Sequence, residues 1–323
     1  MRYTKVEGLE KPVSRIALGT MIVNTRELER SFRLLDDALE LGVNTLDSAW
    51  VYAGGDSERG IGRWMQERKN RDQVVVLTKG CHPNSDRKTV TPFDIQAQLH
   101  DSLARLRADY IDIYLLHRDN PDVPVGPIVE VLNDLRREGK VRAFGGSNWT
   151  EARIKEANQY AAGKGLMGFT ATSPNYSLAE QVQDPWGPGC STIGGPAHEK
   201  DRQWYRENQM AIFAYSSLAR GFLSGRITRE NFEEQKANLD DACRTAYCHE
   251  VNFKRLDRAQ KLAQKKGLSV PQVSLAFILS QGLNVIPLVG AETRDEIQSA
   301  VTASDIELTP EESAWLDLRA ERA

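Results

Sequence analysis

The sequence predicts a (β/α)8 barrel with an N-terminal β-hairpin and long loops after strands six and seven. Eight short apolar runs alternate with longer segments of helical period, which is typical of repeated β-α units around a parallel sheet. The length of 323 residues fits one closed barrel of slightly enlarged size. An open, doubly wound sheet is the main alternative, but no GxGxxG motif joins the first predicted strand to a helix.

The predicted strands and helices divide the chain evenly. The strands are residues 16–18, 43–46, 74–78, 111–116, 143–146, 168–171, 211–215 and 285–289. The helices are residues 25–41, 58–68, 91–106, 125–138, 150–162, 198–207, 253–266 and 270–281. Thr91 and Pro92 mark one helix start, and Gly139 and Gly267 mark two helix ends. No linker separates these elements, so we expect a single domain over residues 1–323.

Several segments lie outside the repeat. Residues 1–14 are expected to form a small hairpin across the bottom of the barrel, with Gly8 near its turn. Residues 179–197 and 222–252 are too long for ordinary connections, and loops after strands six and seven would overhang the active face. Residues 308–312 carry the signature of a capped helix start.

The composition limits the kinds of partner. Forty-two Lys and Arg against 45 Asp and Glu give a net charge of -3, which argues against a nucleic-acid or anionic-membrane binder. We expect a small-molecule partner, and the sequence is also compatible with a homo-oligomer. The N-terminus lacks an apolar core of the signal-peptide type, and no run of about 18 apolar residues occurs, so a cytoplasmic protein is expected. No CxxC or HExxH spacing indicates a metal site.

Polar residues follow four consecutive predicted strands. Asp47 follows strand two, Lys79 strand three, His117 strand four, and Ser147 and Asn148 strand five. The carboxyl ends of barrel strands meet at one face, which is where such folds keep their chemistry. We therefore expect these side chains to converge on the barrel mouth.

Asp47 and Lys79 each end an apolar run, and a buried charge there is costly unless it is paired. The simplest solution is that the two pair with each other across neighbouring strands. A Lys ammonium near Tyr52 would then lower the pKa of that phenol toward the range of a general acid or base. Taken singly, an Asp-Lys pair or a His after an apolar run is more often structural. Their joint placement at consecutive strand ends favours catalysis.

The sequence resembles the aldo-keto reductase family, and the likeness covers nearly the whole chain in the same order. The motifs that carry it are GVNTLDSAWVYAGGDSERGIG at 42–62, LTK at 77–79, SLARLRADYIDIYLLHRD at 102–119, GKVRAFGGSNW at 139–149, FAYSSLARGFLSG at 213–225 and IPLVGAETRDEI at 286–297.

The resemblance implies a nicotinamide cofactor that lies across the barrel mouth and gives hydride directly to a carbonyl carbon. Tyr52 would give the proton, Lys79 and Asp47 would tune it, and His117 would position the carbonyl. The resemblance further assigns Ser147 and Asn148 to the carboxamide of the cofactor, Tyr215 to its ring, Ser216, Leu218 and Arg220 to the pyrophosphate, and Gly290, Ala291, Glu292, Thr293 and Gln298 to the adenosine end.

Two departures from the family pattern bear on the cofactor. The usual Gln at the end of strand six is here Ser173, whose shorter hydroxyl would need a water or a shifted ring to reach the same amide. Glu292 and Gln298 align with basic positions that bind the 2'-phosphate in NADP-dependent members, although Arg294 is near enough in sequence to pair with a phosphate. The family favours NADP slightly, and NAD is the alternative.

The substrate side is expected to be aromatic and polar. Trp50 and Trp149 flank predicted site residues, and Trp186 lies in the loop after strand six. Together with Arg118 and the residues that follow it, such walls would suit a polyol, a sugar or a sugar-derived ketone.

Two other functions fit parts of the pattern. Lys79 at a strand end could form an imine, as in a Schiff-base aldolase. A cofactor-binding regulatory subunit is the second alternative, although the complete set of Asp47, Tyr52, Lys79 and His117 favours retained chemistry.

Overall fold

Eight parallel strands close into a barrel, as the sequence predicts. The computed structural model describes residues 1–322, so the last residue of the predicted domain, 323, lies outside the described residues. The strands run in the order β10-β3-β4-β5-β6-β7-β8-β9 around the closed barrel. Their bounds are β3 (Ala17–Gly19), β4 (Thr45–Asp47), β5 (Val75–Gly80), β6 (Ile111–Leu116), β7 (Val141–Ser147), β8 (Ala171–Ser173), β9 (Ala211–Ala214) and β10 (Val285–Val289). The single-domain assignment stays a prediction.

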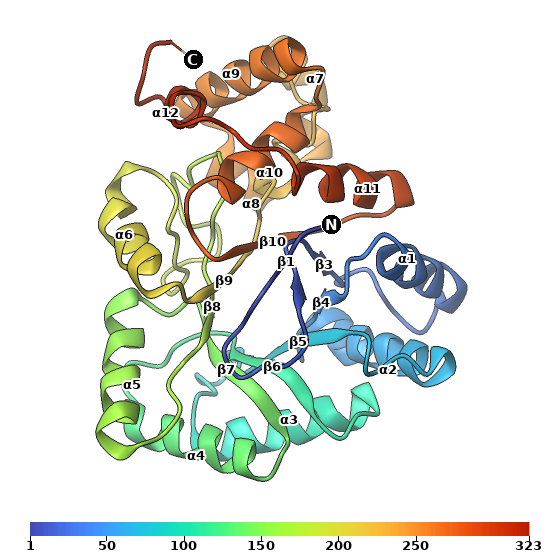
Figure 1. Cartoon of the computed structure of the whole chain (residues 1–323), viewed down its shortest axis with the longest axis vertical. Helices are drawn as coiled ribbons and strands as arrows, with labels where there is room; N and C mark the ends of the chain where they lie inside the picture. The colour runs from blue at the N-terminus through green and yellow to red at the C-terminus, as the bar shows by residue number, and fades with distance from the viewer. Residues whose placement is uncertain (323) are drawn as a thin grey trace.

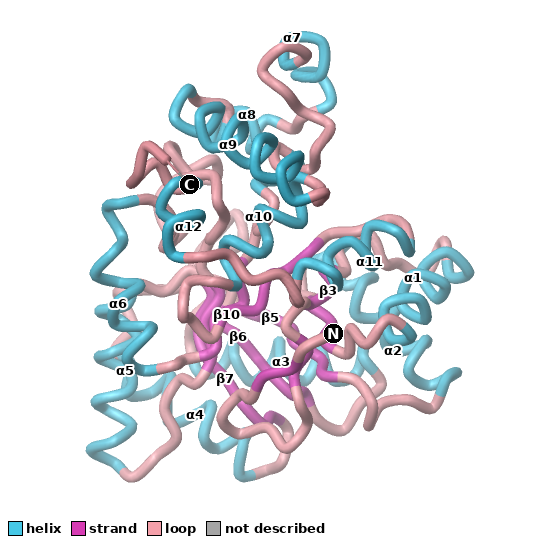
Figure 2. Tube along the Cα trace, turned by 45° about the horizontal axis from the view of Figure 1, so that its top comes forward, coloured by secondary structure: helices cyan, strands magenta, loops and turns pink. Residues whose placement is uncertain are grey.

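Helices surround the strands (Figures 1 and 2). They are α1 (Leu28–Glu40), α2 (Asp56–Arg68), α3 (Pro92–Leu106), α4 (Val125–Arg137), α5 (Glu151–Lys164), α6 (Glu199–Asn208), α7 (Phe232–Gln235), α8 (Asp241–Tyr247), α9 (Glu250–Lys266), α10 (Val270–Leu279), α11 (Arg294–Ala303) and α12 (Pro310–Leu316). Short 3-10 turns are η1 (Tyr52–Gly55), η2 (Pro196–His198), η3 (Ala219–Gly221) and η4 (Lys236–Asn238). Figure 1 shows α7, α9 and α12 gathered at one end of the long axis, beyond α10.

The barrel interior is a separate apolar cluster built from alternate strand residues. It includes Val75 and Leu77 of β5 and Ile113 and Leu115 of β6, all fully buried. Because side chains alternate between the two faces of a strand, the next residue in each series also faces the interior. A second, larger cluster fills the space between the strands and the surrounding helices.

The predicted N-terminal hairpin is confirmed. β1 (Tyr3–Thr4) pairs antiparallel with β2 (Val13–Ser14), and Gly8 lies in the connection with a φ of 92°. The hairpin contributes Val6 and Val13 to the interior cluster. Lys11 ties it to the start of β6 through Asp112, with Nζ 3.0 Å from Oδ1. The hairpin therefore closes the end of the barrel opposite the strand ends that carry Lys79 and His117.

Both long loops exist, but the second contains helices that the sequence reading left out. α7, η4 and α8 lie within residues 222–252, and α9 begins at Glu250 rather than at 253. Helix α11 after β10 was also missed, although its start has a sequence signal: the Thr293 hydroxyl accepts a hydrogen bond from the backbone N–H of Glu296.

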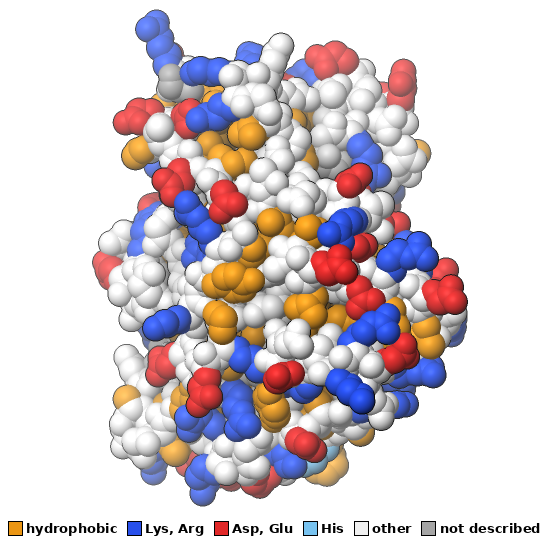
Figure 3. All heavy atoms as spheres, turned by 45° about the vertical axis from the view of Figure 1, so that its right-hand side comes forward, with side chains coloured by type: hydrophobic (Ala, Val, Ile, Leu, Met, Phe, Trp, Pro, Cys, Tyr) orange, Lys and Arg blue, Asp and Glu red, His pale blue; other side chains and the backbone are white. Residues whose placement is uncertain are grey.

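The surface carries both signs of charge. Figure 3 shows Lys and Arg side chains interspersed with Asp and Glu over one face, with hydrophobic side chains between them. Among residues 1–322, no helix has the length and apolarity needed to cross a membrane.

Candidate active site

The predicted catalytic side chains converge at the carboxyl end of the barrel. Lys79 lies two residues beyond the interior residue Leu77, and His117 two beyond Leu115, so both continue the inward-facing series. Asp47 ends β4 and is opposite Leu77 in the strand pairing. Exposed fractions of 3% for Asp47, 2% for Lys79 and 9% for His117 place all three below the surface.

Lys79 links Asp47 to Tyr52. Its ammonium forms a very short ion pair with the Asp47 carboxylate, donates to the Ser48 carbonyl at 3.0 Å, and donates to the Tyr52 hydroxyl at 3.4 Å. Tyr52 begins the η1 turn, and the Lys79 nitrogen lies 5.0 Å from the centre of its ring. The structure thus brings together three predicted residues from two strands and a turn in one chain of polar contacts.

The electrostatics of this chain depart from the expectation in one respect. Burial raises the pKa of Tyr52, and the opposing effect of the Lys79 charge does not outweigh it. Lys79 shows the reverse balance, because burial would lower its pKa but the charges of Asp47 and Tyr52 raise it above the usual range. The expectation that Lys79 brings the Tyr52 pKa below its ordinary value is therefore wrong here. Tyr52 is held as a phenol beside a charged ammonium.

His117 is a neutral imidazole against the Tyr52 ring. The ring centres are 6.0 Å apart at an interplanar angle of 78°. Burial lowers the pKa of His117 well below the usual value, and the charges of Lys79 and Arg118 add to this. Within residues 1–322 its buried Nδ1 has no hydrogen-bond partner, which is unusual for a buried polar atom.

His82 also lies at the mouth, although it is not among the residues predicted from the sequence. Its ring centre is 5.0 Å from that of His117, and its Nδ1 is 2.8 Å from the Pro83 carbonyl oxygen. The available signal was its position three residues after Lys79, in the loop beyond β5.

The residues predicted for the cofactor carboxamide lie together, but their polar atoms already hydrogen-bond to one another and to Ser191. The Asn148 side-chain oxygen accepts from the Tyr215 hydroxyl at 2.8 Å and from the Ser191 backbone N–H at 3.1 Å. The Ser147 hydroxyl donates to the Ser173 carbonyl at 3.1 Å. These contacts would have to exchange before Asn148 could hold a cofactor amide.

Two features at this end fit a nicotinamide cofactor. The Ser173 hydroxyl is fully buried and has no hydrogen-bond partner, which is costly unless a ligand completes it. At the β10 end, the space in front of Gly290 is open, since a Cβ built there meets no atom within 4 Å. The first feature supports the placement of Ser173 despite the missing Gln, and the second leaves room for an approaching ligand.

The predicted pyrophosphate segment follows β9 and bends sharply. Ser216, Ala219 and Arg220 have φ of 52°, 51° and 54°, in the left-handed region that non-glycine residues rarely adopt. Leu218 packs against the cluster between the strands and the helices, and against a further apolar cluster that includes Phe222 and Leu256. Arg220 pairs with Asp240, with its Nε 3.0 Å from Oδ2, so a pyrophosphate would have to compete with this carboxylate.

The predicted adenosine end is exposed and acidic. Glu292 pairs with Arg30 of α1 at 2.9 Å, and its backbone N–H donates to Glu296. Arg294 pairs with Asp37 at 2.6 Å and with Glu40 at 2.8 Å, so a 2'-phosphate would have to compete with these carboxylates for it. Ala291 is buried, whereas Thr293 and Gln298 are exposed on or beside α11.

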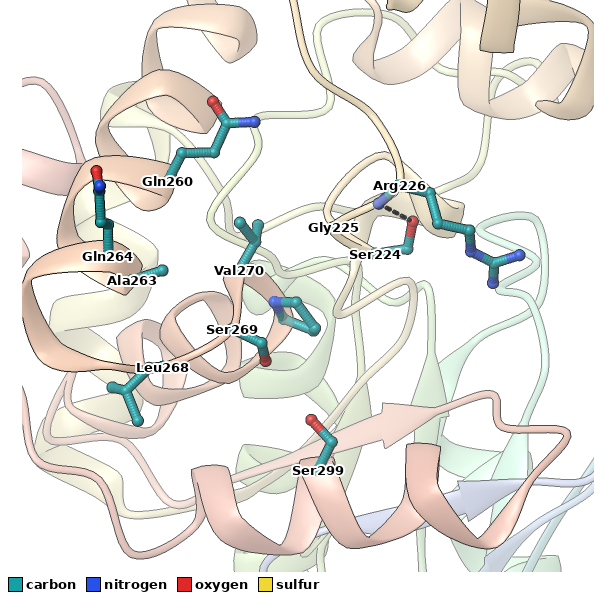
Figure 4. A pocket seen from close by; sticks show the side chains of 11 residues that line it. Ser224, Gly225, Arg226, Gln260, Ala263, Gln264, Leu268, Ser269, Val270 and Ser299 are labelled. Carbon is teal, nitrogen blue, oxygen red and sulfur yellow. Dashed lines mark hydrogen bonds between the residues drawn. The ribbon is translucent and has the colours of Figure 1, made fainter.

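A hollow of about 630 Å³ lies beyond this end and is lined by none of the predicted site residues. It is bounded by residues 224–226, by the turn between α9 and α10, and by Ser299 of α11. Figure 4 shows Ser299 pointing from its helix toward the other lining residues, while the Arg226 side chain points away. It adjoins α11 but is separate from the chemistry around Tyr52.

Two of the three tryptophans do not form substrate walls. Trp149 is 1% exposed and packs on Phe169 with ring centres 5.0 Å apart, so its predicted role as a wall is wrong. The Trp50 indole N–H donates to Asp101 at 3.2 Å, and Arg105 lies over its ring, which turns the ring toward α3. Trp186, in contrast, is 43% exposed and lies 6.1 Å from the Tyr215 ring.

Large exposed apolar side chains mark the rim of the mouth. They follow strand ends: Met21 and Ile22 after β3, Phe93 at the start of α3, and Val182 and Trp186 after β8. Among residues 1–322, no group of three His, Cys, Asp or Glu side chains is arranged to hold a metal ion.

Comparison with known proteins agrees with this geometry. Residues 15–318 match the model of the Aldo/keto reductase family. The aldo-keto reductase YhdN of Bacillus subtilis (strain 168) is 28% identical, over 93% of this chain and 87% of its own length. An aryl-alcohol dehydrogenase (NADP+) of Phanerodontia chrysosporium is 28% identical, over 94% of this chain and 82% of its own. The structure of the glycerol dehydrogenase AKR11B4 from Gluconobacter oxydans superposes with a TM-score of 0.77 at 25% identity, and covers 98% of this chain and 94% of that one. The chain therefore belongs to the Aldo/keto reductase family, oxidoreductases that act on carbonyl compounds and alcohols with a nicotinamide cofactor.

Proposed function

We propose that this protein interconverts an aldehyde or ketone and the corresponding alcohol, with Tyr52 as the general acid and base. The observation that carries the proposal is the linked set of Asp47, Lys79 and Tyr52, with His117 at the edge of the Tyr52 ring. These groups are held by strand ends and a short turn, so they are already oriented.

Each side chain has a distinct role in the proposal. Tyr52 gives its proton to the carbonyl oxygen in reduction and takes it back in oxidation. Its raised pKa, set by burial against the opposing Lys79 charge, keeps the proton in place until the oxygen becomes basic. The Lys79 ammonium stabilises the phenolate that remains, and Asp47 holds that ammonium charged and in position. Neutral His117 donates a hydrogen bond that orients the carbonyl.

When bound, the cofactor would supply the hydride, and residues of this chain would form its binding site. Ser147, Asn148 and Ser173 would bind the carboxamide, and Tyr215 would pack on the ring. Ser216, Leu218 and Arg220 would line the pyrophosphate, and Gly290, Ala291, Glu292, Thr293 and Gln298 would surround the adenosine. The NADP+ in the name of a similar dehydrogenase favours NADP. The carboxylates of Glu292 and Glu296 favour NAD, because they repel a phosphate and can accept from a ribose diol.

A Schiff-base reaction at Lys79 has less support. A nucleophilic amine must be deprotonated, whereas the Asp47 carboxylate raises the pKa of Lys79 against the effect of burial. Borohydride trapping distinguishes the two reactions, since a covalent adduct on Lys79 is expected only for imine chemistry.

The first experiment is a fluorescence titration with NADPH and with NADH, followed by a panel of aldehydes, ketones and alcohols with the tighter cofactor. We expect saturable binding of at least one cofactor and turnover of at least one carbonyl. If neither cofactor binds, the proposed function is wrong. We also propose that the protein acts in the cytoplasm on a small-molecule substrate, as its composition suggests.

A further inference from the structure

Arg118 stands out among the charged groups at the mouth because it has no acidic partner. It follows His117 directly, and its Nη1 donates to the His117 carbonyl at 3.0 Å. No carboxylate lies within 4 Å of its guanidinium among residues 1–322. The adjacent Asp119 pairs with Arg153 at 3.2 Å instead. An arginine has five N–H donors, and here a single hydrogen bond uses one of them.

The Arg118 side chain is half-buried and lies beside the ends of β6 and β7. The carbonyl oxygen that accepts from Arg118 also accepts from the Asn148 amide at 3.4 Å, so the two side chains meet at one atom. Burial causes most of the pKa shift of Tyr52, His82 and His117, and the Arg118 charge acts on all three. The Arg118 charge also lowers the pKa of Tyr215 and of Cys190, although burial has the larger, opposite effect on both. The shared His117 carbonyl places Arg118 beside Asn148, between the ends of β6 and β7.

The charges at the mouth do not balance. Lys79 is neutralised by Asp47, and His82 and His117 are both disfavoured as cations by burial and by Arg118. Asp184, which lies beside Cys190, forms no ion pair with Arg118 among the described residues. One positive charge is left in a partly enclosed space beside the general acid. A guanidinium in such a setting can bind a carboxylate or phosphate through two parallel, bidentate hydrogen bonds.

We infer that the substrate is a carbonyl compound bearing an anionic group, a carboxylate or a phosphate, that pairs with Arg118 while the carbonyl oxygen meets Tyr52 and His117. This inference rests on the proposed function and narrows its substrate class. An anionic substrate replaces the neutral sugar or polyol expected from the sequence. Of the two tryptophans expected to stack on such a sugar, Trp50 is turned toward α3 and Trp149 is buried. The apolar rim at Met21, Ile22 and Trp186 suits a hydrophobic body between the anion and solvent.

The test compares two aldehydes that differ in charge at one position, 4-carboxybenzaldehyde and 4-methylbenzaldehyde, with the full chain and saturating cofactor. We expect kcat/KM for the carboxylate to exceed that for the methyl compound by about tenfold or more, mainly through KM. In Arg118→Gln this ratio should fall toward one, and in Arg118→Lys it should take an intermediate value. Arg137→Gln, which removes an exposed charge from α4, should keep the wild-type ratio.

The carboxylate preference also has a readout that does not need turnover. The affinity of 4-methylbenzoate for the cofactor-loaded protein, measured by calorimetry, should fall about tenfold in Arg118→Gln and remain unchanged in Arg137→Gln. An equal ratio for the two aldehydes in wild type, or a ratio that Arg118→Gln leaves intact, would overturn the inference while leaving carbonyl reduction established. If no carbonyl of the panel reacts, the proposed function fails, and the benzoate measurement alone decides whether Arg118 binds an anion.

Discussion

On the β4 to β6 side of the mouth the predicted residues form one linked set, whereas on the β7 to β10 side they are also bonded to residues outside the predicted site. Lys79 bridges Asp47 and Tyr52 in the first region. In the second, Asn148 accepts from Ser191, and Arg220 pairs with Asp240. The proposed proton-transfer groups are thus oriented before any ligand arrives, whereas binding at the proposed cofactor site would have to exchange existing contacts.

The difference follows from where the side chains are attached. The first set lies on strand ends whose inward direction is fixed by alternation, and its charges are buried and must be paired. The second set lies largely on loops whose polar groups are reached by their neighbours. Loops can exchange partners at modest cost, since a single hydrogen bond contributes only about 1 kcal/mol net. Catalytic geometry and cofactor exchange are therefore assigned to different parts of the same rim.

The largest expected effect is the loss of the proton donor. Tyr52→Phe should lower kcat by at least about 100-fold, because it removes the acid and keeps the ring. Cofactor affinity, measured by fluorescence, should change little, since Tyr52 lies on the other side of the mouth. Tyr160→Phe, at an exposed position on α5, serves as the control and should keep full activity. Activity in Tyr52→Phe equal to that of the control would remove Tyr52 from its role.

The next effect concerns the buried ion pair. Lys79→Met leaves the Asp47 carboxylate unpaired below the surface, which should lower the free energy of unfolding by about 3–5 kcal/mol. The double variant Asp47→Asn with Lys79→Met removes both charges and should regain most of that stability without regaining activity. Urea denaturation of both variants and the wild type measures this. A double variant no more stable than Lys79→Met would show that the loss is one of packing rather than charge.

A smaller effect is expected on the cofactor side. Tyr215→Phe removes the hydroxyl that occupies the Asn148 oxygen but keeps an aromatic ring. If that bond must break on cofactor binding, the cofactor dissociation constant should fall by about two- to tenfold, as expected for one hydrogen bond. Tyr215→Ala, which also removes the ring, should weaken binding instead. Weaker binding in Tyr215→Phe would show that the hydroxyl supports the bound state.

The smallest effect is expected at the exposed adenosine end. Glu292→Gln removes a negative charge and releases Arg30, so the preference for NADPH over NADH should rise by about two- to fivefold, in line with exposed charge pairs. Glu311→Gln on α12 removes the same charge far from α11 and is the matched control. An unchanged preference in Glu292→Gln would mean that the 2'-phosphate does not approach this side chain.

The barrel and its catalytic corner were largely predictable from sequence. Apolar runs that end in Asp47, Lys79 and His117 predict both the strands and the direction of those side chains. A charged or titratable side chain is rarely buried without a partner or a function, so its place at the end of an apolar run indicates a site. The hairpin was predictable from Gly8, because a glycine favours the turn between two short strands.

The predictions that were wrong concern side chains whose surroundings are set by contacts between distant segments. Nothing local distinguishes Trp149, which is buried against Phe169, from Trp186, which is exposed at the mouth. The partners of Arg294 on α1 and of Arg220 at Asp240 come from remote sequence positions. His82 and the start of α11 did carry local signals, namely a position just after β5 and a Thr-x-x-Glu pattern at residues 293–296.

The closure of the barrel has a consequence for how the protein is made. Strand β3 pairs with β10, so residue 17 must meet residue 288, near the other end of the chain. Asp47, Tyr52, Lys79 and His117 are all synthesised long before that contact can form, and such distant pairings slow folding. A nascent chain thus carries every proposed proton-transfer group without the barrel that orients them. We expect the emerging polypeptide to stay inactive until β10 leaves the ribosome and completes the ring.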